Sequence, residues 1–101
     1  METPWRFRGL ERTELLGFEV QVATTRLSRL LGLALISPER AGAGLLIPRC
    51  RSVHTFGMLF PLDLVFFDRE GRVVELCRHV PAGRVVRRPA ADAVLELPSP
   101  T

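Results

Sequence analysis

The stretch PLDLVFFDREGRVVELCRHV, residues 61–80, decides the fold of this chain. Its first half is a nearly continuous apolar run, which is typical of a strand buried on both faces. The tetrapeptide REGR follows, and Gly71 suits a turn position that requires positive φ. The second half, VVELCRHV, can return as a second strand. Residues 61–80 therefore predict a β-hairpin, in which Asp63 carries a charge into the buried strand.

Shorter apolar segments on both sides of the hairpin predict the rest of the sheet. GFEVQVA (17–23) alternates apolar and polar residues, while AGAGLLIP (41–48) and DAVLELP (92–98) contain short apolar runs bounded by turn residues. An early strand or arm within residues 1–16 and a short extended piece at residues 85–86 complete the count. We expect an α+β fold: a small antiparallel or mixed, barrel-like β-sheet of five to six strands with one short helix.

The segment TTRLSRLLGL (24–33) has the periodicity of a helix. Thr24 or Thr25 can cap its N-terminus, and Gly32 can end it because glycine tolerates positive φ. An apolar stripe at positions i, i+3 and i+4 predicts the face that packs on the sheet. This stripe consists of Leu27, Leu30 and Leu31.

Composition places the chain among ordinary globular domains. It has 101 residues, of which 47% are hydrophobic and 25% charged, so we expect one domain over residues 1–101, with a frayed tail at 99–101. No apolar run is long enough to span a bilayer, and the start resembles no secretory signal. We therefore expect a cytoplasmic protein whose two cysteines, Cys50 and Cys77, are reduced thiols.

Basic residues gather in one segment. All 14 basic residues are arginines, and residues 76–91 contain four of them and no acid: Arg78, Arg84, Arg87 and Arg88. A solvated loop is the prediction, and a site for phosphate or an acidic partner is the alternative. The segment lacks the interleaved aromatic residues that stack on single-stranded nucleic acids, so we do not expect nucleic-acid binding.

The stretch CRSVHTFGMLFPLD, residues 50–63, is rich in reactive side chains. Cys50, His54 and Met58 are spaced by four, and thiolate, imidazole and thioether are ligands that copper(I) prefers. A structural interpretation competes with this one. Cys50 and Met58 can be polarisable core residues, and His54 can be held by a hydrogen bond. We expect no metal and no other cofactor.

The same stretch supplies the residue types of a thiol triad in Cys50, His54 and Asp63. A nucleophilic thiol needs a lowered pKa, but neighbouring arginines on a strand point to the opposite face, and no glycine-rich oxyanion loop follows. Asp63 has a second expected role. A carboxylate in a buried strand needs partners. We expect either Arg29, in a structural ion pair or at the mouth of a ligand pocket, or backbone N–H donors.

Three segments, ATTRLSRLLGL, GLLIPRCRSVHTFGMLFPLDLVFFDREGRVV and AVLELP, resemble the prokaryotic family known as domain of unknown function 192, over about residues 18–98. The most specific block comprises Cys50, His54, Thr55, Phe56, Met58, Pro61 and Asp63, and it resembles a Cys/His-Thr-Phe branch of that family. Ser28 stands where the family pattern has glutamate. The resemblance implies a compact β-rich fold with a packed helix and no established reaction.

These observations favour a noncatalytic binding or accessory module of unknown ligand. The alternative is a small hydrolase-like or metal-binding protein that uses Cys50, His54 and Asp63. A third hypothesis is a protein partner, or a second copy of the chain, that docks on an exposed edge of the sheet.

Overall fold

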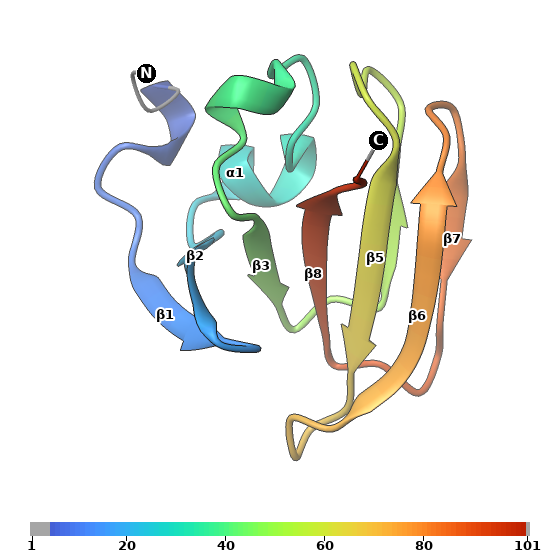
Figure 1. Ribbon diagram of the computed structural model, residues 1–101. Coiled ribbons are helices and arrows are strands. Elements are labelled where there is room, and N and C mark those ends of the chain that lie inside the picture. Colours follow the sequence, from blue (N-terminus) through green and yellow to red (C-terminus); the bar gives the residue numbers. More distant parts are fainter. Residues whose placement is uncertain (1–4, 101) are drawn as a thin grey trace.

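The computed structural model describes residues 5–100, apart from the side chain of Trp5, and forms two β-sheets with short helices (Figure 1). Residues 1–4 and Thr101, at the start of the expected early arm and at the end of the expected frayed tail, lie outside the described residues. The α+β class is confirmed. The strands are β1 (Arg12–Leu15), β2 (Phe18–Val22), β3 (Leu45–Pro48), β4 (Ser52–His54), β5 (Leu62–Phe67), β6 (Val73–Val80), β7 (Val85–Arg87) and β8 (Ala93–Pro98).

The helices are all short. They are the 3-10 turn η1 (Trp5–Phe7), the α-helix α1 (Arg26–Leu31) and the 3-10 turn η2 (Pro38–Arg40). None of the helices formed by residues 5–100 has the length and apolar character needed to cross a membrane.

In the described part of the chain, the main sheet has six strands in the order β1-β2-β3-β8-β5-β6, and β4 and β7 form a separate pair. Among the strands of residues 5–100, only β2 and β3 pair in parallel, because the chain between them crosses over through α1 and η2. The barrel-like closure that we expected is wrong, because the sheet is open with β1 and β6 at its edges. The last strand, β8, pairs with β3 and β5 in the middle of the sheet, so it does not join the edges.

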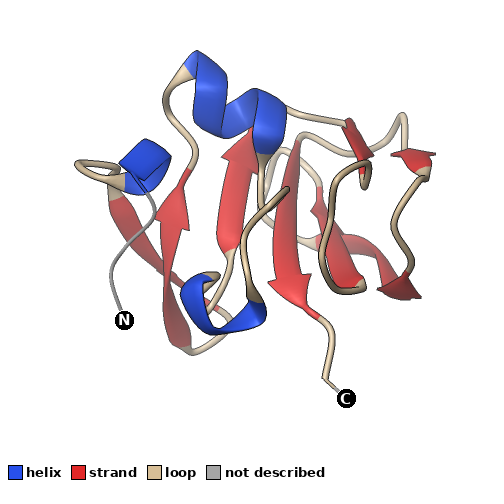
Figure 2. Cartoon of the chain, turned by 90° about the horizontal axis from the view of Figure 1, so that it is seen from above, coloured by secondary structure: helices blue, strands red, loops and turns tan. Residues whose placement is uncertain are grey.

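The larger core cluster lies on one face of the main sheet, beneath α1, the segment after it and the β4–β7 pair (Figure 2). Alternation along the central strands directs one set of side chains to this face, and the other set forms a smaller cluster on the opposite face. The sheet contributes Leu45, Ile47, Leu62, Leu64, Phe66 and Val94 to the larger cluster. The smaller cluster is built on Val20, Val65, Phe67 and Leu95.

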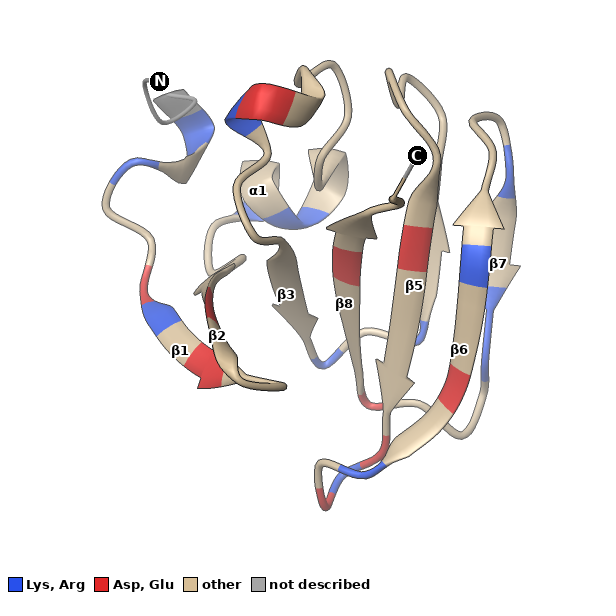
Figure 3. Cartoon of the chain, in the orientation of Figure 1, with Lys and Arg blue, Asp and Glu red and all other residues tan. Residues whose placement is uncertain are grey.

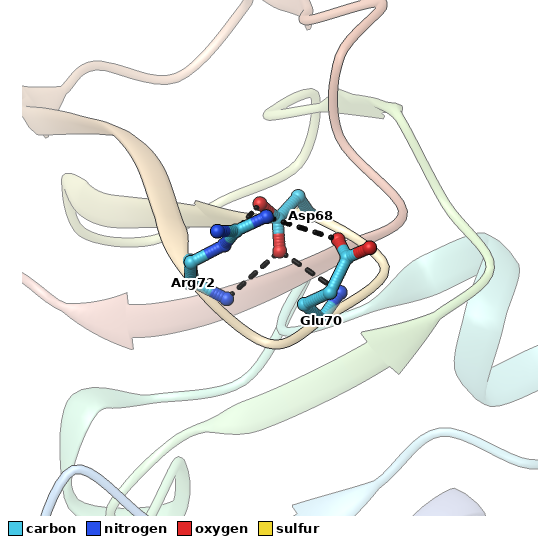
Figure 4. A network of polar contacts seen from close by, with 3 residues as sticks. All are labelled: Asp68, Glu70 and Arg72. Carbon is cyan, nitrogen blue, oxygen red and sulfur yellow. Dashed lines mark hydrogen bonds and ion pairs between the residues drawn. The ribbon is translucent and has the colours of Figure 1, made fainter.

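The predicted hairpin is confirmed as β5 and β6, and all six residues of β5 are buried. Its turn is organised by one carboxylate (Figure 4). Oδ1 of Asp68 accepts the backbone N–H groups of Glu70 and Arg72, each at 2.9 Å, and its Oδ2 accepts Nε of Arg72 at 3.1 Å. These hydrogen bonds, that from the Arg72 backbone first, lower the pKa of Asp68. Gly71 adopts φ +81°, as the turn requires.

The helix is where we predicted it, but its predicted packing face is wrong. Leu27 is 36% exposed and Leu30 65% exposed, whereas Ser28 is buried. Ser28 and the N-cap Thr25 form a capping box, each side chain accepting the other's backbone N–H at 3.1 Å. The apolar residues that pack on the sheet follow the helix instead: Leu33, Ala34 and Ile36. The six-residue helix is therefore held in place by its capping box and by the buried apolar residues that follow it. Its own leucine stripe does not form the packing face.

Candidate functional site

The three residues of the expected thiol triad each have a backbone partner of their own. The Cys50 thiol donates to the Ser52 carbonyl at 3.2 Å, the His54 ring bonds the Leu30 carbonyl at 2.8 Å, and Asp63 accepts a backbone N–H from β6. Within residues 5–100, no three His, Cys, Asp or Glu side chains lie close enough together to hold a metal ion. Met58, the third proposed copper ligand, lies in the larger core cluster, and Cys50 packs partly against that cluster.

Both ring nitrogens of His54 are engaged, which determines its tautomer. Nδ1 accepts the backbone N–H of Phe56 at 3.1 Å, so the ring proton is on Nε2 and is donated to the Leu30 carbonyl. The ring also stacks on Phe56, with 5.8 Å between centroids and 22° between planes. His54 thus ties β4 to the end of α1 and has no nitrogen available as a general base.

Thr55, the next residue, closes the turn between β6 and β7. It is fully buried, and its Oγ1 donates to the Pro81 carbonyl at 2.7 Å and accepts the Arg84 N–H at 2.8 Å. Its backbone exchanges hydrogen bonds with the same turn: its N–H donates to Arg84 and its carbonyl accepts from Gly83. The His-Thr-Phe motif is therefore a structural junction between α1, β4 and the β6–β7 turn.

Asp63 stabilises a β-bulge in the hairpin. Leu62 pairs with Val80 and Leu64 with Cys77, so two residues of β6 stand opposite Asp63. One of them, His79, has φ +54°, and its N–H donates to Oδ1 of Asp63 at 2.8 Å. The other, Arg78, lies at 4.0 Å from Oδ2. The carboxylate therefore satisfies a backbone donor that the bulge removes from the ladder.

Arg29 and Asp63, the expected polar pair, do not contact each other. The guanidinium of Arg29 donates instead to the carbonyls of Pro48 at 2.5 Å and Arg49 at 3.2 Å. Sequence reasoning was right that Asp63 needs a partner, but the bulge offers a backbone donor nearer than any arginine of the helix.

Asp63→Ala should lower the free energy of unfolding by about 1–3 kcal/mol, because the His79 N–H loses its acceptor in a partly buried position. Asp63→Asn, which keeps an acceptor, is the matched control and should cost less. Urea unfolding of the three proteins measures the difference. An alanine variant as stable as the wild type would show that solvent satisfies the bulge equally well.

The four arginines of the predicted basic segment occupy different surroundings. Arg84 and Arg87 are exposed, and Arg78 approaches Asp63. Arg88 instead donates to Glu75 at 2.7 Å, and the thiol of Cys77 donates to the same carboxylate oxygen at 3.1 Å. Burial, and then this hydrogen bond, raise the pKa of Cys77. Cys77 therefore favours the protonated thiol, which is a poor nucleophile.

Sequence reasoning missed Glu96, which belongs to β8 and is only 1% exposed. Figure 3 shows the acidic position of β8 in red. Leu45 of β3 and Leu64 of β5 flank it in the sheet. Its Oε1 accepts the N–H of Leu33 at 3.1 Å, just after α1. Burial raises the pKa of Glu96 to about 7, against smaller opposing effects of the Leu33 hydrogen bond and the charge of Arg6.

A glycine makes room for this carboxyl group. A Cβ atom on Gly32 would lie 2.4 Å from Oε1 of Glu96, and Gly32 has φ +53°. Arg6 binds the same turn from its other side, donating to the Gly32 carbonyl at 3.0 Å and to the Ala34 carbonyl. The turn after α1 is thus held by Glu96 through an N–H group and by Arg6 through carbonyl groups.

Glu96 lines a pocket of about 150 Å³ between α1, β3, β4 and β8. Most of the other lining side chains are apolar, while Arg29, Ser52 and His54 are polar. The lining residues are Arg29, Leu30, Leu31, Gly32, Ile47, Ser52, Val53, His54 and Glu96. Two of the candidates named from sequence, Arg29 and His54, line this pocket. The lining does not include Cys50, Met58 or Asp63.

The pattern of β8 contained a signal for Glu96. In AVLELP, Val94 and Glu96 share one face, which alternation on an otherwise apolar strand assigns to the core. A single acid at such a position predicts a buried carboxyl group. The sequence could not show that Gly32 and Leu33, more than sixty residues earlier, would surround it.

Fold and site together define a small α+β fold with a pocket of about 150 Å³ beside its helix. The chain belongs to the family of domain of unknown function 192, whose model carries the description "Uncharacterized ACR" and matches residues 9–101. No curated protein matches the sequence. Among solved structures, a protein of unknown function from Novosphingobium aromaticivorans DSM 12444 is similar, with a TM-score of 0.64 and 15% identity over 98% of this chain and 89% of that one. At this identity the likeness shows a shared fold.

Proposed function

We propose that this protein is a noncatalytic binding module whose small-molecule ligand enters the pocket between α1, β3, β4 and β8. The observation that carries the proposal is the buried carboxyl group of Glu96 on the wall of a pocket with mainly apolar surroundings. Binding pockets commonly combine apolar walls with a few polar groups that orient the ligand.

Two further observations favour binding over catalysis. Cys50, His54 and Asp63 each serve a backbone partner, so they do not form a nucleophile, base and orienting acid in one chain of hydrogen bonds. Three large apolar side chains are exposed near the pocket. Leu30 is on its wall, Phe56 stacks on His54, and the N–H of Leu35 donates to the carbonyl of the residue after Phe56. Exposed apolar groups beside a pocket are typical of a surface that receives a ligand.

A fragment screen by two-dimensional NMR tests this proposal. We expect a subset of fragments to shift the amide signals of Gly32, Leu33 and Val53, and Ser52→Phe, which places a ring on the exposed pocket wall, to abolish these shifts. Ala82→Phe, on an exposed turn away from the pocket lining, is the matched control and should bind like the wild type. A screen without pocket shifts, or binding that survives Ser52→Phe unchanged, would refute the pocket as the binding site.

We also propose that the module works in the cytoplasm of a prokaryote and can act beside a protein partner or a second copy of itself. Free thiols at Cys50 and Cys77 support a reducing compartment. The edge strand β6, with Val73, Val74 and Leu76 exposed, supports docking of another strand. A monomer at every concentration in sedimentation velocity would refute the second copy.

A further inference from the structure

The wall of the pocket carries a carboxyl oxygen to which no described group donates. Oε1 of Glu96 accepts the Leu33 N–H, whereas Oε2 receives no donor from residues 5–100. Among these residues the buried side-chain atom without a partner is Nε of Arg6, so Oε2 keeps a small contact with solvent although Glu96 is only 1% exposed. A carboxylate with so little access to water is costly, and the cost is relieved by a proton or by a ligand that brings a donor.

The backbone around this carboxyl group is rich in acceptors that already hold cations. Arg6 donates to the carbonyls of the turn after α1, and Arg29 donates to those of Pro48 and Arg49 at the end of β3. The Leu30 carbonyl accepts a hydrogen bond from Nε2–H of His54. The N–H groups of Arg29 that make these bonds are directed to the backbone, so the guanidinium on the pocket wall does not pair with Glu96.

The size of the pocket limits the ligand. A cavity of about 150 Å³ with apolar walls holds a body the size of benzene. Leu31, Ile47 and Val53 supply apolar contacts along these walls.

We propose that the pocket binds a small organic cation, in which an ammonium group on an apolar body of about six to eight heavy atoms donates to Oε2 of Glu96. This inference rests on the proposed binding function and specifies the chemistry of its ligand. The cation would pair with the carboxylate form of Glu96. Without a ligand, burial raises the pKa of Glu96 and thereby favours the protonated form. Binding should therefore release the proton that Glu96 carries.

The groups around Glu96 allow the pH dependence to be assigned. The charged groups near Glu96 are Arg6, which precedes β1, and Arg29, which belongs to α1, while His54 of β4 is the histidine at the pocket. The neighbouring strands β3 and β5 present Leu45 and Leu64. Because the pKa of Glu96 is about 7, affinity for a cation should rise about tenfold from about pH 6 to about pH 8.

Benzylamine, benzyl alcohol and benzoate test the proposal, because they share one ring and differ in the charge of the attached group. We expect benzylamine to bind most tightly, to shift the Leu33 amide, and to bind about tenfold more tightly at about pH 8 than at about pH 6. Calorimetry of the wild type in buffers of different ionisation enthalpy should show release of close to one proton at the lower pH. Glu96→Gln should lose the pH dependence and at least tenfold in affinity, and His54→Gln, which removes the histidine at the pocket, should keep the pH dependence.

The outcomes separate this inference from the pocket itself. Benzyl alcohol or benzoate binding as tightly as benzylamine, or an amine affinity that is constant with pH, would overturn the cationic ligand while leaving the pocket as a binding site. Binding of none of the three would also overturn it. Only a fragment screen without Ser52-sensitive binding would remove the proposed function as well.

Discussion

Phe66→Ala should lower the free energy of unfolding by about 3–5 kcal/mol. Phe66 is fully buried in the centre of β5, where it belongs to the larger core cluster and the Arg88 guanidinium lies 5.8 Å from its ring centroid. Removing the ring loses the favourable free energy of moving it from water into the core. It also leaves a cavity, because the surrounding side chains relax only partly. A chain of this length has a total stability of about 5–15 kcal/mol, so the variant should lose a large part of it.

Leu30→Ala is the matched control for this prediction, because it also truncates a large apolar side chain. Leu30 is 65% exposed, so its truncation should change the free energy of unfolding by less than about 0.5 kcal/mol. Chemical denaturation of both variants measures the contrast. A loss of about 2 kcal/mol or more in Leu30→Ala would mean that the helix packs through its leucine stripe after all.

Glu96 should make the protein more stable at about pH 5 than at about pH 8, by on the order of 3 kcal/mol. The pKa is about 7 in the folded protein and 4.5 in the unfolded chain, so the folded state binds the proton more tightly. The contribution of Glu96 to stability is fully present below the pKa of the unfolded chain, and it is lost as the pH rises through the pKa of the folded protein. It therefore disappears between about pH 4.5 and pH 7.5.

Glu96→Gln isolates this effect, since glutamine keeps an acceptor for the Leu33 N–H and does not titrate. The difference in stability between wild type and variant should change with pH by about 3 kcal/mol, and the two histidines, present in both proteins, cancel. The cost of burying the glutamine amide is the same at every pH, so it does not contribute to this change with pH. A pH-independent difference would show that water reaches the carboxyl group and leaves its pKa near the ordinary value.

The site was only partly predictable, for reasons that differ between residues. His54 was expected to be held by a hydrogen bond, and it is, although its partner at the end of α1 could not be named. Asp63 was expected to be fixed by Arg29 or by backbone donors, and the bulge at His79 supplies the donor. A bulge is a property of two paired strands, so neither strand alone indicates it.

The sequence by itself determined the elements of this protein: the buried strand β5, its return in β6, the capped helix and the short strands β2, β3 and β8. These follow from alternation, turn residues and caps, which act over a few neighbouring positions. Tertiary structure alone decided that β8 enters the middle of an open sheet, that α1 turns Ser28 inward and Leu30 outward, and that Glu96 meets Gly32 and Leu33 at a pocket. The physical reason is that burial and pKa depend on which distant segments exclude water from a side chain, and local patterns do not specify those segments.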